Sequence, residues 1–394
     1  MSEQSCPGFR FAGAAGGIKK KGGLDVGLIA CERPASASAV FTANRVKAAP
    51  VVLSQRALRA GGGKLRAVVV NSGNANACTG RQGMLDARRM AAVTGDAVGC
   101  PPGAVLVAST GVIGQPLPMD RVEAGIAKAG AGLVEDGFAA FAEAILTTDR
   151  RAKTAARRVR LGRTEATLLG CTKGAGMIAP NMATTLTFVV TDAAVVPPLL
   201  GRTVKRAVEP TFNAIAVDGD TSTNDTLAVL ASGRGPKATG KDLVRFEAAL
   251  TDLLDDLAHQ LMGDGEGVHH VVTVRIKGAA SEASARAIAR RVATSPLVKT
   301  AIAGGDPNWG RILCAIGNAG VPIKPDRLDL WIEDLRIVAA GAVAAEHDEA
   351  KAAAMMKQAA YTITADLHAG RAEAHYLACD LSHEYVSINA DYRS

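Results

Sequence analysis

The N-terminal part of the chain alternates between short apolar runs and segments with helical spacing. Apolar runs at Ala39–Thr42, Arg66–Val70 and Val105–Ser109 predict strands, and Leu53–Arg59 and Leu85–Val98 place apolar residues at helical intervals. Glycine-rich turns separate these segments. Strands that alternate with helices are typical of an α/β fold.

The same alternation continues through the middle of the chain. Met119–Ala129, with Asp120 in its first turn, and Leu133–Leu146 predict helices, because an acidic residue stabilises a helix N-terminus. Lys153–Leu161 alternates between polar and apolar residues and predicts a strand, and Leu186–Val190 predicts a buried strand. The middle of the chain therefore also has α/β character.

The C-terminal part of the sequence predicts a separate α+β lobe. Near Gly278 the composition changes to a segment rich in Ala and Arg, which predicts a helix. The elements expected beyond Pro210 are two strands around the turn Asp218–Asp220, a helix at Lys241–Met262, a strand at His270–Ile276, the Ala/Arg helix, a strand at Leu328–Val338, a helix at Glu346–Ala359 and two final strands.

Composition narrows the class of protein. The chain has 394 residues, of which 48% are hydrophobic and 21% charged, so we expect two or three globular domains. Aromatic residues make up only 4%, which argues against a base-stacking nucleic-acid surface. The seven cysteines are scattered without a CxxC spacing, and no signal peptide or long apolar run is present. The sequence thus predicts a cytoplasmic protein with no nucleic-acid or membrane partner.

One segment accounts for the net charge of +7. Residues 150–163 contain seven basic residues and no carboxylate, so the rest of the chain sums to zero. We expect these side chains to be solvated on a hairpin or loop, rather than to form a nucleic-acid surface. The seven residues are Arg150, Arg151, Lys153, Arg157, Arg158, Arg160 and Arg163.

The segment Lys173–Leu186 carries the strongest chemical signal. Gly174, Gly176 and Pro180 oppose regular structure, and a β-branched run then begins abruptly at Thr184. On residue types alone, a strand that enters the core is the simpler interpretation. The alternative is a nucleophilic threonine at a junction between loop and strand.

The chemistry of that alternative is specific. A threonine hydroxyl can attack the carbonyl of the preceding residue and convert the amide into an ester. Hydrolysis of the ester then frees the α-amino group of the threonine. With a pKa near ~8, this amine is a local general base for the same hydroxyl.

Eight motifs, taken together and in order, resemble the ornithine acetyltransferase (glutamate N-acetyltransferase) family of arginine biosynthesis. The resemblance extends over essentially the whole chain, which makes it far more specific than any single motif. The motifs are Val69–Asn76, Ser109–Gly114, Thr147–Asp149, Lys173–Thr185, Val217–Asp225, Gly263–Gly267, Asp306–Arg311 and Tyr385–Tyr392.

The resemblance implies a fold and a maturation step. The implied fold is an α/β (α+β) αββα sandwich with an N-terminal-nucleophile site, followed by a smaller C-terminal α+β lobe. Self-cleavage between Ala183 and Thr184 would give an α chain and a β chain that assemble as α2β2. The implied parts are residues 1–183 with the oxyanion-hole half of the sandwich, 184–279 with the nucleophile half, and 280–394 as the lobe with a substrate-binding tail.

The resemblance also implies roles for particular residues. Thr184 matches the nucleophile, and Thr110 and Gly111 match an oxyanion hole, although a Thr-Gly pair that ends a strand is usually a plain turn. The implied substrate-binding residues are Thr147, Lys173, Thr184, Glu266, Asn389 and the terminal Ser394. Two departures from the family pattern are His269 and His270 after Glu266 and a final Ser in place of Thr.

The implied reaction moves acetyl from N2-acetyl-L-ornithine to L-glutamate through acetyl-Thr184. It requires no metal or organic cofactor; the carboxylates Asp218, Asp220 and Asp225 are better explained as caps of a turn than as a metal site. The resemblance leaves open whether acetyl-CoA is also a donor. Two alternatives differ in outcome: a related self-processing aminopeptidase or amidase would use water as acceptor, and a binding protein would stay one uncut chain.

Overall fold

The computed structural model describes residues 5–178 and 185–391. Three residues with expected roles, Ala183, Thr184 and Ser394, lie outside the described residues.

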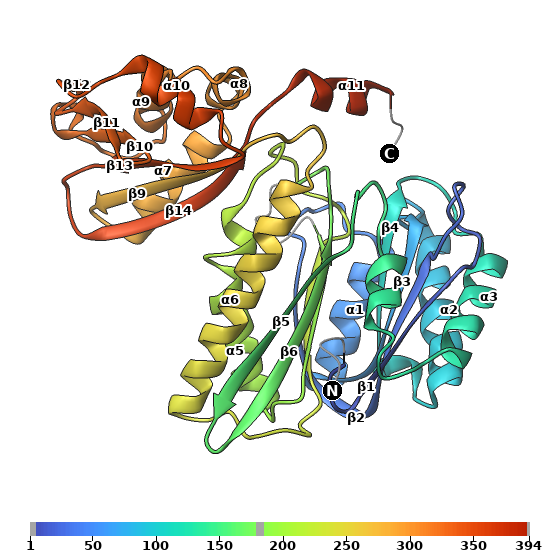
Figure 1. The fold of residues 1–394 in the computed structure, drawn as a ribbon. Helices are drawn as coiled ribbons and strands as arrows, with labels where there is room; N and C mark the ends of the chain where they lie inside the picture. Colours follow the sequence, from blue (N-terminus) through green and yellow to red (C-terminus); the bar gives the residue numbers. More distant parts are fainter. Residues whose placement is uncertain (1–4, 179–184, 392–394) are drawn as a thin grey trace.

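The larger unit is built on an eight-stranded sheet with the order β4-β3-β2-β8-β7-β6-β5, and β1 pairs with β2 (Figure 1). Parallel pairing joins β3 to β4 and β7 to β8, and the other pairs are antiparallel. The strands are β1 (Phe9–Ala14), β2 (Val26–Phe41), β3 (Lys64–Asn74), β4 (Val105–Val112), β5 (Lys153–Leu161), β6 (Thr164–Lys173), β7 (Leu186–Thr191) and β8 (Thr226–Ala231).

The long strand β2 joins two halves of this sheet. Its first part, Val26–Ala30, pairs with β1 and β3, and its last part, Ser36–Phe41, pairs with β8. The register shifts between these parts, where the strand bends. Apolar side chains of β3 and β4 then pack against those of β6, β7 and β8 in one internal core. The two halves therefore face each other as the two β layers of a sandwich.

Helices cover the outer face of each β layer. α2 and α3 pack on the outer side of β2, β3 and β4, and α5 and α6 pack on the outer side of β6, β7 and β8. This gives the four layers α, β, β, α that the resemblance implied. The helices are α1 (Ala49–Ala60), α2 (Gly80–Val98), α3 (Met119–Ala131), α4 (Phe138–Ala144), α5 (Pro197–Val208) and α6 (Lys241–Gly263), with short 3-10 turns η1 (Pro102–Ala104) and η2 (Phe212–Ala214).

The C-terminal lobe has its own six-stranded sheet and its own apolar core. The strand order is β12-β11-β10-β13-β9-β14, and apolar side chains of helices α7 to α10 pack with those of the sheet in this core. The elements are β9 (Val271–Ala279), α7 (Glu282–Ala293), α8 (Pro296–Gly304), α9 (Trp309–Gly317), η3 (Pro325–Arg327), β10 (Asp329–Ile332), β11 (Leu335–Ala339), β12 (Ala342–Val343), α10 (Glu349–Met356), β13 (Ala360–Asp366) and β14 (Ala372–Cys379).

The last helix returns to the sandwich. α11 (His383–Asp391) lies apart from the lobe, above the sandwich, in Figure 1. Tyr385 packs against the core formed by β6–β8 and α5–α6. The C-terminal segment is thus placed over the larger unit, where its polar side chains reach the site described below.

Several expected elements differ from those observed. The helix expected at Leu133–Leu146 is limited to α4, and the strand expected at Leu328–Val338 is divided into β10 and β11 by a turn in which Glu333 has φ +51°. The strand expected before the turn Asp218–Asp220 is absent, because that backbone bonds to Ile178 instead. β9 lies within the segment 184–279 that we assigned to the nucleophile half, yet it pairs in the second sheet.

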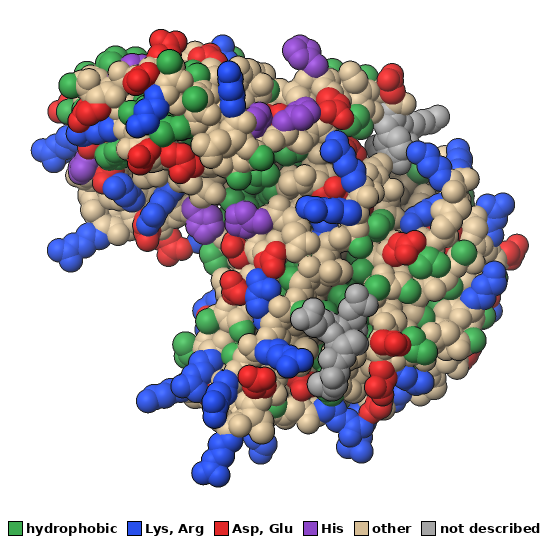
Figure 2. Space-filling model, in the orientation of Figure 1, with side chains coloured by type: hydrophobic (Ala, Val, Ile, Leu, Met, Phe, Trp, Pro, Cys, Tyr) green, Lys and Arg blue, Asp and Glu red, His purple; other side chains and the backbone are tan. Residues whose placement is uncertain are grey.

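The basic segment 150–163 forms β5 and the turn of the β5–β6 hairpin, in agreement with the expected hairpin or loop. Figure 2 shows Lys and Arg side chains gathered at the lower left, over the ends of β5, β6 and α6, with Asp and Glu side chains among them. Arg157, for example, pairs with Asp252 and Asp256 of α6. The expectation of a solvated segment is wrong for Lys153, which is completely buried.

Candidate active site

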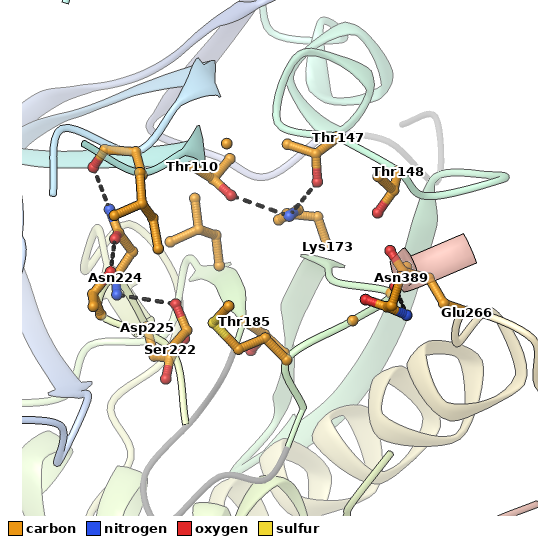
Figure 3. Close-up of a pocket in the computed structure, with 18 residues that line it drawn as sticks. Thr110, Thr147, Thr148, Lys173, Thr185, Ser222, Asn224, Asp225, Glu266 and Asn389 are labelled. Carbon is orange, nitrogen blue, oxygen red and sulfur yellow. Dashed lines mark hydrogen bonds between the residues drawn. The ribbon is translucent and has the colours of Figure 1, made fainter. Parts of the chain in front are cut away.

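One polar pocket collects the described residues for which the sequence predicted a role. Its lining includes the end of β4, the loop between α4 and β5, the end of β6, the turn after α6 and α11 (Figure 3). Thr185 and Leu186, which directly follow Thr184 in the sequence, also line it. The predicted residues in the lining are Thr110, Gly111, Thr147, Lys173, Glu266 and Asn389.

Lys173 is the central cation of this pocket. Its Nζ donates hydrogen bonds to Thr147 Oγ1 at 2.6 Å and to Thr110 Oγ1 at 3.1 Å. An ammonium group has only donors, so both hydroxyl oxygens act as acceptors toward it. The hydroxyl hydrogen of Thr110 is therefore free to point elsewhere and can donate to an oxyanion in the pocket.

Gly111 brings two strand ends into close contact. Its φ is +131°, and a Cβ at this position would overlap the backbone of Gly73 on the neighbouring strand. Only glycine fits this conformation without strain. Asn224 holds the same region, because its Nδ2 donates to Ser109 O at 2.8 Å and to Ala75 O at 2.5 Å. The Thr110-Gly111 backbone is thereby fixed at the wall of the pocket.

A buried ion-pair network lies behind Lys173. Asp149 Oδ1 accepts hydrogen bonds from Lys153 Nζ at 2.6 Å and from Gly174 N at 2.7 Å, and its Oδ2 lies 4.0 Å from Lys173 Nζ. Lys153 also pairs with Asp264 at 2.5 Å. Burial alone would raise the pKa of Asp149, but the ammonium groups of Lys173 and Lys153 hold it well below its usual range.

The same network affects the charge state of Lys173. Burial lowers the pKa of Lys173, and the Asp149 carboxylate opposes this effect. Asp149 also accepts a hydrogen bond from Thr147 N at 2.9 Å. One carboxylate therefore supports both the position of Thr147 and the positive charge of Lys173.

Glu266 lies on another wall of the pocket, next to the C-terminal helix. Its Oε2 accepts a hydrogen bond from Asn389 Nδ2 at 3.2 Å, and its backbone N donates to Ala175 O at 2.8 Å. A Cβ on Gly176 would lie 2.5 Å from Glu266 Oε2, so a larger residue there would displace the carboxylate from this position. The pocket thus has a cation on one wall and an anion on another (Figure 3).

Asp225 is a second, fully buried acid in the pocket lining. Burial raises the pKa of Asp225 well above its usual value, while hydrogen bonds from Ser222 and from the Thr185 backbone act in the opposite direction. Its Oδ2 has no hydrogen-bond partner among the described residues. This environment favours the neutral acid, which can donate a hydrogen bond as well as accept one.

Sequence reasoning missed the supporting carboxylates. Asp149 and Asp264 occur within motifs that we had noted, but neither received a role, and Lys153 was expected on the surface. Asp149 directly follows the candidate Thr147-Thr148 pair, which is a signal that could have been used. Nothing local to the sequence indicates that Lys153 and Asp264 meet.

Residues 5–178 and 185–391 contain neither a candidate metal site nor a candidate membrane-spanning helix. No cluster of three or more His, Cys, Asp or Glu side chains has the arrangement to hold a metal ion. Within the same residues, none of the helices combines the length and apolar character needed to span a membrane.

The αββα sandwich places hydroxyl, ammonium and carboxylate groups around one pocket, and these are groups that an acyl-transfer enzyme needs. Residues 10–394 match the ArgJ family, and the chain belongs to that family. The arginine biosynthesis bifunctional protein ArgJ of Geobacter sulfurreducens is 47% identical over 391 residues, which cover 98% of this chain and 99% of the relative. The protein of the same name from Symbiobacterium thermophilum is 50% identical over 393 residues, covering 98% and 97%.

A solved structure agrees with the fold. The crystal structure of arginine biosynthesis bifunctional protein argJ from Bacillus halodurans has 38% sequence identity and a TM-score of 0.50. It covers 52% of this chain and 98% of the solved chain.

Proposed function

We propose that this protein is a self-processing acetyltransferase of arginine biosynthesis that moves acetyl from N2-acetyl-L-ornithine to L-glutamate. The observation that carries the proposal is the arrangement of Thr110, Lys173 and Glu266 around one pocket beside Thr185. The names of the relatives place them in arginine biosynthesis and describe them as bifunctional.

Maturation comes first in the proposed sequence of events. The Thr184 hydroxyl attacks the carbonyl carbon of Ala183, and the C–N bond breaks as the hydroxyl proton passes to the nitrogen. Water hydrolyses the resulting ester and leaves an α chain, 1–183, and a β chain, 184–394.

Acetyl transfer then follows a double displacement. The freed α-amine of Thr184 removes the proton of its own hydroxyl, which attacks the acetyl carbonyl of the donor. Thr110 and Gly111 donate hydrogen bonds to the oxyanion, and ornithine leaves with the proton. L-glutamate then takes the acetyl group from Thr184 by the reverse steps.

The charges of the pocket match the charges of these substrates. Ornithine carries a side-chain ammonium, for which Glu266 is the acidic partner, and both substrates carry carboxylates, for which Lys173 is the basic partner. Thr147 and Asn389 supply neutral hydrogen bonds beside them, and Ser394 is the proposed further contact from the terminus.

Three finer points belong to the same proposal. The α and β chains assemble as α2β2, the enzyme works in the cytoplasm, and no metal or organic cofactor takes part in the steps above.

Because the relatives are named bifunctional, acetyl-CoA is proposed as a second acetyl donor for glutamate. The chain division into 1–183, 184–279 and 280–394 stays a prediction.

A direct assay separates this function from its main alternative. We expect release of ornithine from N2-acetylornithine to depend on glutamate and to match N-acetylglutamate formation one to one. An aminopeptidase or amidase would release ornithine at the same rate without glutamate, and that result would overturn the proposal. A parallel assay with acetyl-CoA and glutamate decides the second donor.

Replacing Thr110 with Ala removes a donor from the proposed oxyanion hole. We expect kcat to fall by roughly 10²-fold with a smaller change in KM, because the lost hydrogen bond acts mainly in the transition state. Thr110→Ser, which keeps the hydroxyl, should retain most of the activity. Steady-state kinetics test this, and an unchanged kcat in Thr110→Ala, where chemistry limits turnover, would remove Thr110 from the mechanism.

Replacing Glu266 with Gln removes a charge from the pocket and keeps the shape of the side chain. We expect use of N2-acetylornithine to weaken by about 1.5 to 3 kcal/mol, the range for hydrogen bonds to charged groups. Self-cleavage should survive, since it needs no bound ornithine. The control is kcat/KM for a neutral acetylated donor without the side-chain amine. An equal loss for both donors would show that Glu266 does not bind the ammonium.

A further inference from the structure

One carboxylate holds the last described residues before the proposed cleavage site. Asp218 Oδ2 accepts a hydrogen bond from Met177 N at 2.6 Å, and Asp218 Oδ1 accepts one from Ile178 N at 2.9 Å. Both oxygens are therefore used on two successive peptide groups. Hydrogen bonds from amides to a carboxylate are stronger than those between neutral groups, so this is a firm attachment.

Further contacts fix the same short segment. Ile178 O accepts a hydrogen bond from Val217 N at 2.6 Å, and Ala175 O accepts one from Glu266 N. Met177 has φ +57°, in the left-handed region that is strained for a non-glycine residue. Such a conformation persists only where the surrounding contacts enforce it. The contacts with Asp218 and Val217 are the ones that do so here.

The loop that carries Asp218 also reaches the other side of the cleavage site. Thr226 N donates to Thr185 O at 2.9 Å, and Thr185 is the residue directly after Thr184. Burial and the nearby Asp218 carboxylate raise the pKa of Tyr385 of α11, so these two side chains lie close together. The residues 217–226 thus hold the chain on both sides of the segment that contains the Ala183–Thr184 bond.

We infer that Asp218 is a positioning residue for self-cleavage, and that it acts more strongly on maturation than on acetyl transfer. The inference rests on the proposed function. Intramolecular attack requires the hydroxyl and the carbonyl carbon to be held in the reacting geometry, and a fixed backbone on the upstream side limits the conformations that must be searched. Once the bond is cut, this constraint no longer affects the Thr184 hydroxyl, which belongs to the other chain.

The test compares Asp218→Asn with Asp220→Asn. Asn keeps one acceptor oxygen, but its amide NH2 faces an N–H donor, so one of the two backbone hydrogen bonds is lost. The Asp220 side chain is exposed, and its contact with Asp218 is made through its backbone N, which the control variant keeps. Purified precursor is followed over time by mass measurement under denaturing conditions, and kcat/KM is expressed per cleaved β chain.

We expect the Asp218→Asn precursor to be cleaved at least about tenfold more slowly than the wild-type precursor, while the Asp220→Asn precursor is cleaved at the wild-type rate. Activity per cleaved chain should fall much less than the cleavage rate, although Met177, which Asp218 holds, also lines the pocket. Conversion of Asp218→Asn at the wild-type rate would overturn the inference, as would an equal fall in conversion and in activity per cleaved chain. If Asp218→Asn does not fold, Asp218→Glu gives the same comparison, because it displaces both acceptor oxygens by one methylene. A wild-type chain that never cleaves would instead contradict the proposed function itself.

Discussion

Replacing Thr184 with Ala is expected to leave one uncut chain and to lower acetyl transfer by roughly 10⁴-fold or more. The substitution removes the hydroxyl that attacks Ala183 and the same hydroxyl that would carry the acetyl group. Without cleavage the α-amino group also stays in a peptide bond and cannot act as the base. Denaturing mass measurement and the glutamate-dependent assay follow the two losses separately.

Two other variants make this prediction specific. Thr184→Ser keeps a hydroxyl and should both cleave and transfer acetyl, more slowly than wild type. Thr300→Ala, at an exposed position of α8 in the C-terminal lobe, should behave as wild type. Full activity in an uncut Thr184→Ala chain would remove the nucleophile from the account.

Replacing Asp149 with Asn is expected to cause the largest loss of stability among the residues of the site. The side chains of Asp149 and Lys153 are both completely buried, so the variant leaves Lys153 with Asp264 alone. Removing one partner of a buried ion pair costs about 3–5 kcal/mol. Urea unfolding in the uncut Thr184→Ala background measures this loss, because both proteins are then single chains.

The stability that Asp149 contributes should decrease at acidic pH. The folded-state pKa of Asp149 lies well below its usual value, so its contribution is fully present above the unfolded pKa of about 3.9 and is lost as the pH falls toward the folded pKa. The difference in unfolding free energy between the Thr184→Ala protein and the same protein with Asp149→Asn should therefore be constant from neutral pH down to about 5. It should shrink below about pH 4. Asp256→Asn, at the half-exposed pair with Arg157, is the control and should cost only about 0–1 kcal/mol. Equal losses in the two variants would contradict the buried network.

The fold could be predicted from sequence where periodicity was strong. The strand Lys153–Leu161 has the expected bounds, and α6 (Lys241–Gly263) exceeds the expected helix by one residue, because alternation and helical spacing are local properties of the sequence. The strand expected before Asp218 was wrong because its backbone partner, Ile178, is distant in the sequence. Tertiary hydrogen bonds of this kind leave no periodic pattern.

The candidate site was predicted mainly through the resemblance to a family. Residue types alone favoured a plain turn at Thr110-Gly111, whereas the structure places both residues in one pocket with Lys173. The buried ion pair between Lys153 and Asp264, which lies behind Lys173, could not be predicted, because its two residues come from distant parts of the chain. Burial of a lysine against two carboxylates depends on how β5 meets the turn after α6.

The central claim is that Thr184 carries the acetyl group between donor and acceptor. The most direct measurement mixes mature enzyme with N2-acetylornithine in the absence of glutamate, stops the reaction with acid and maps acetyl by mass on peptides of both chains. Acid keeps the α-amine protonated, so the acetyl group stays on oxygen. The account predicts one acetyl ester on Thr184 at the start of the β chain, and its loss with formation of N-acetylglutamate when glutamate is added. An enzyme that is fully active while its acetyl group is on another residue, or on none, would contradict it.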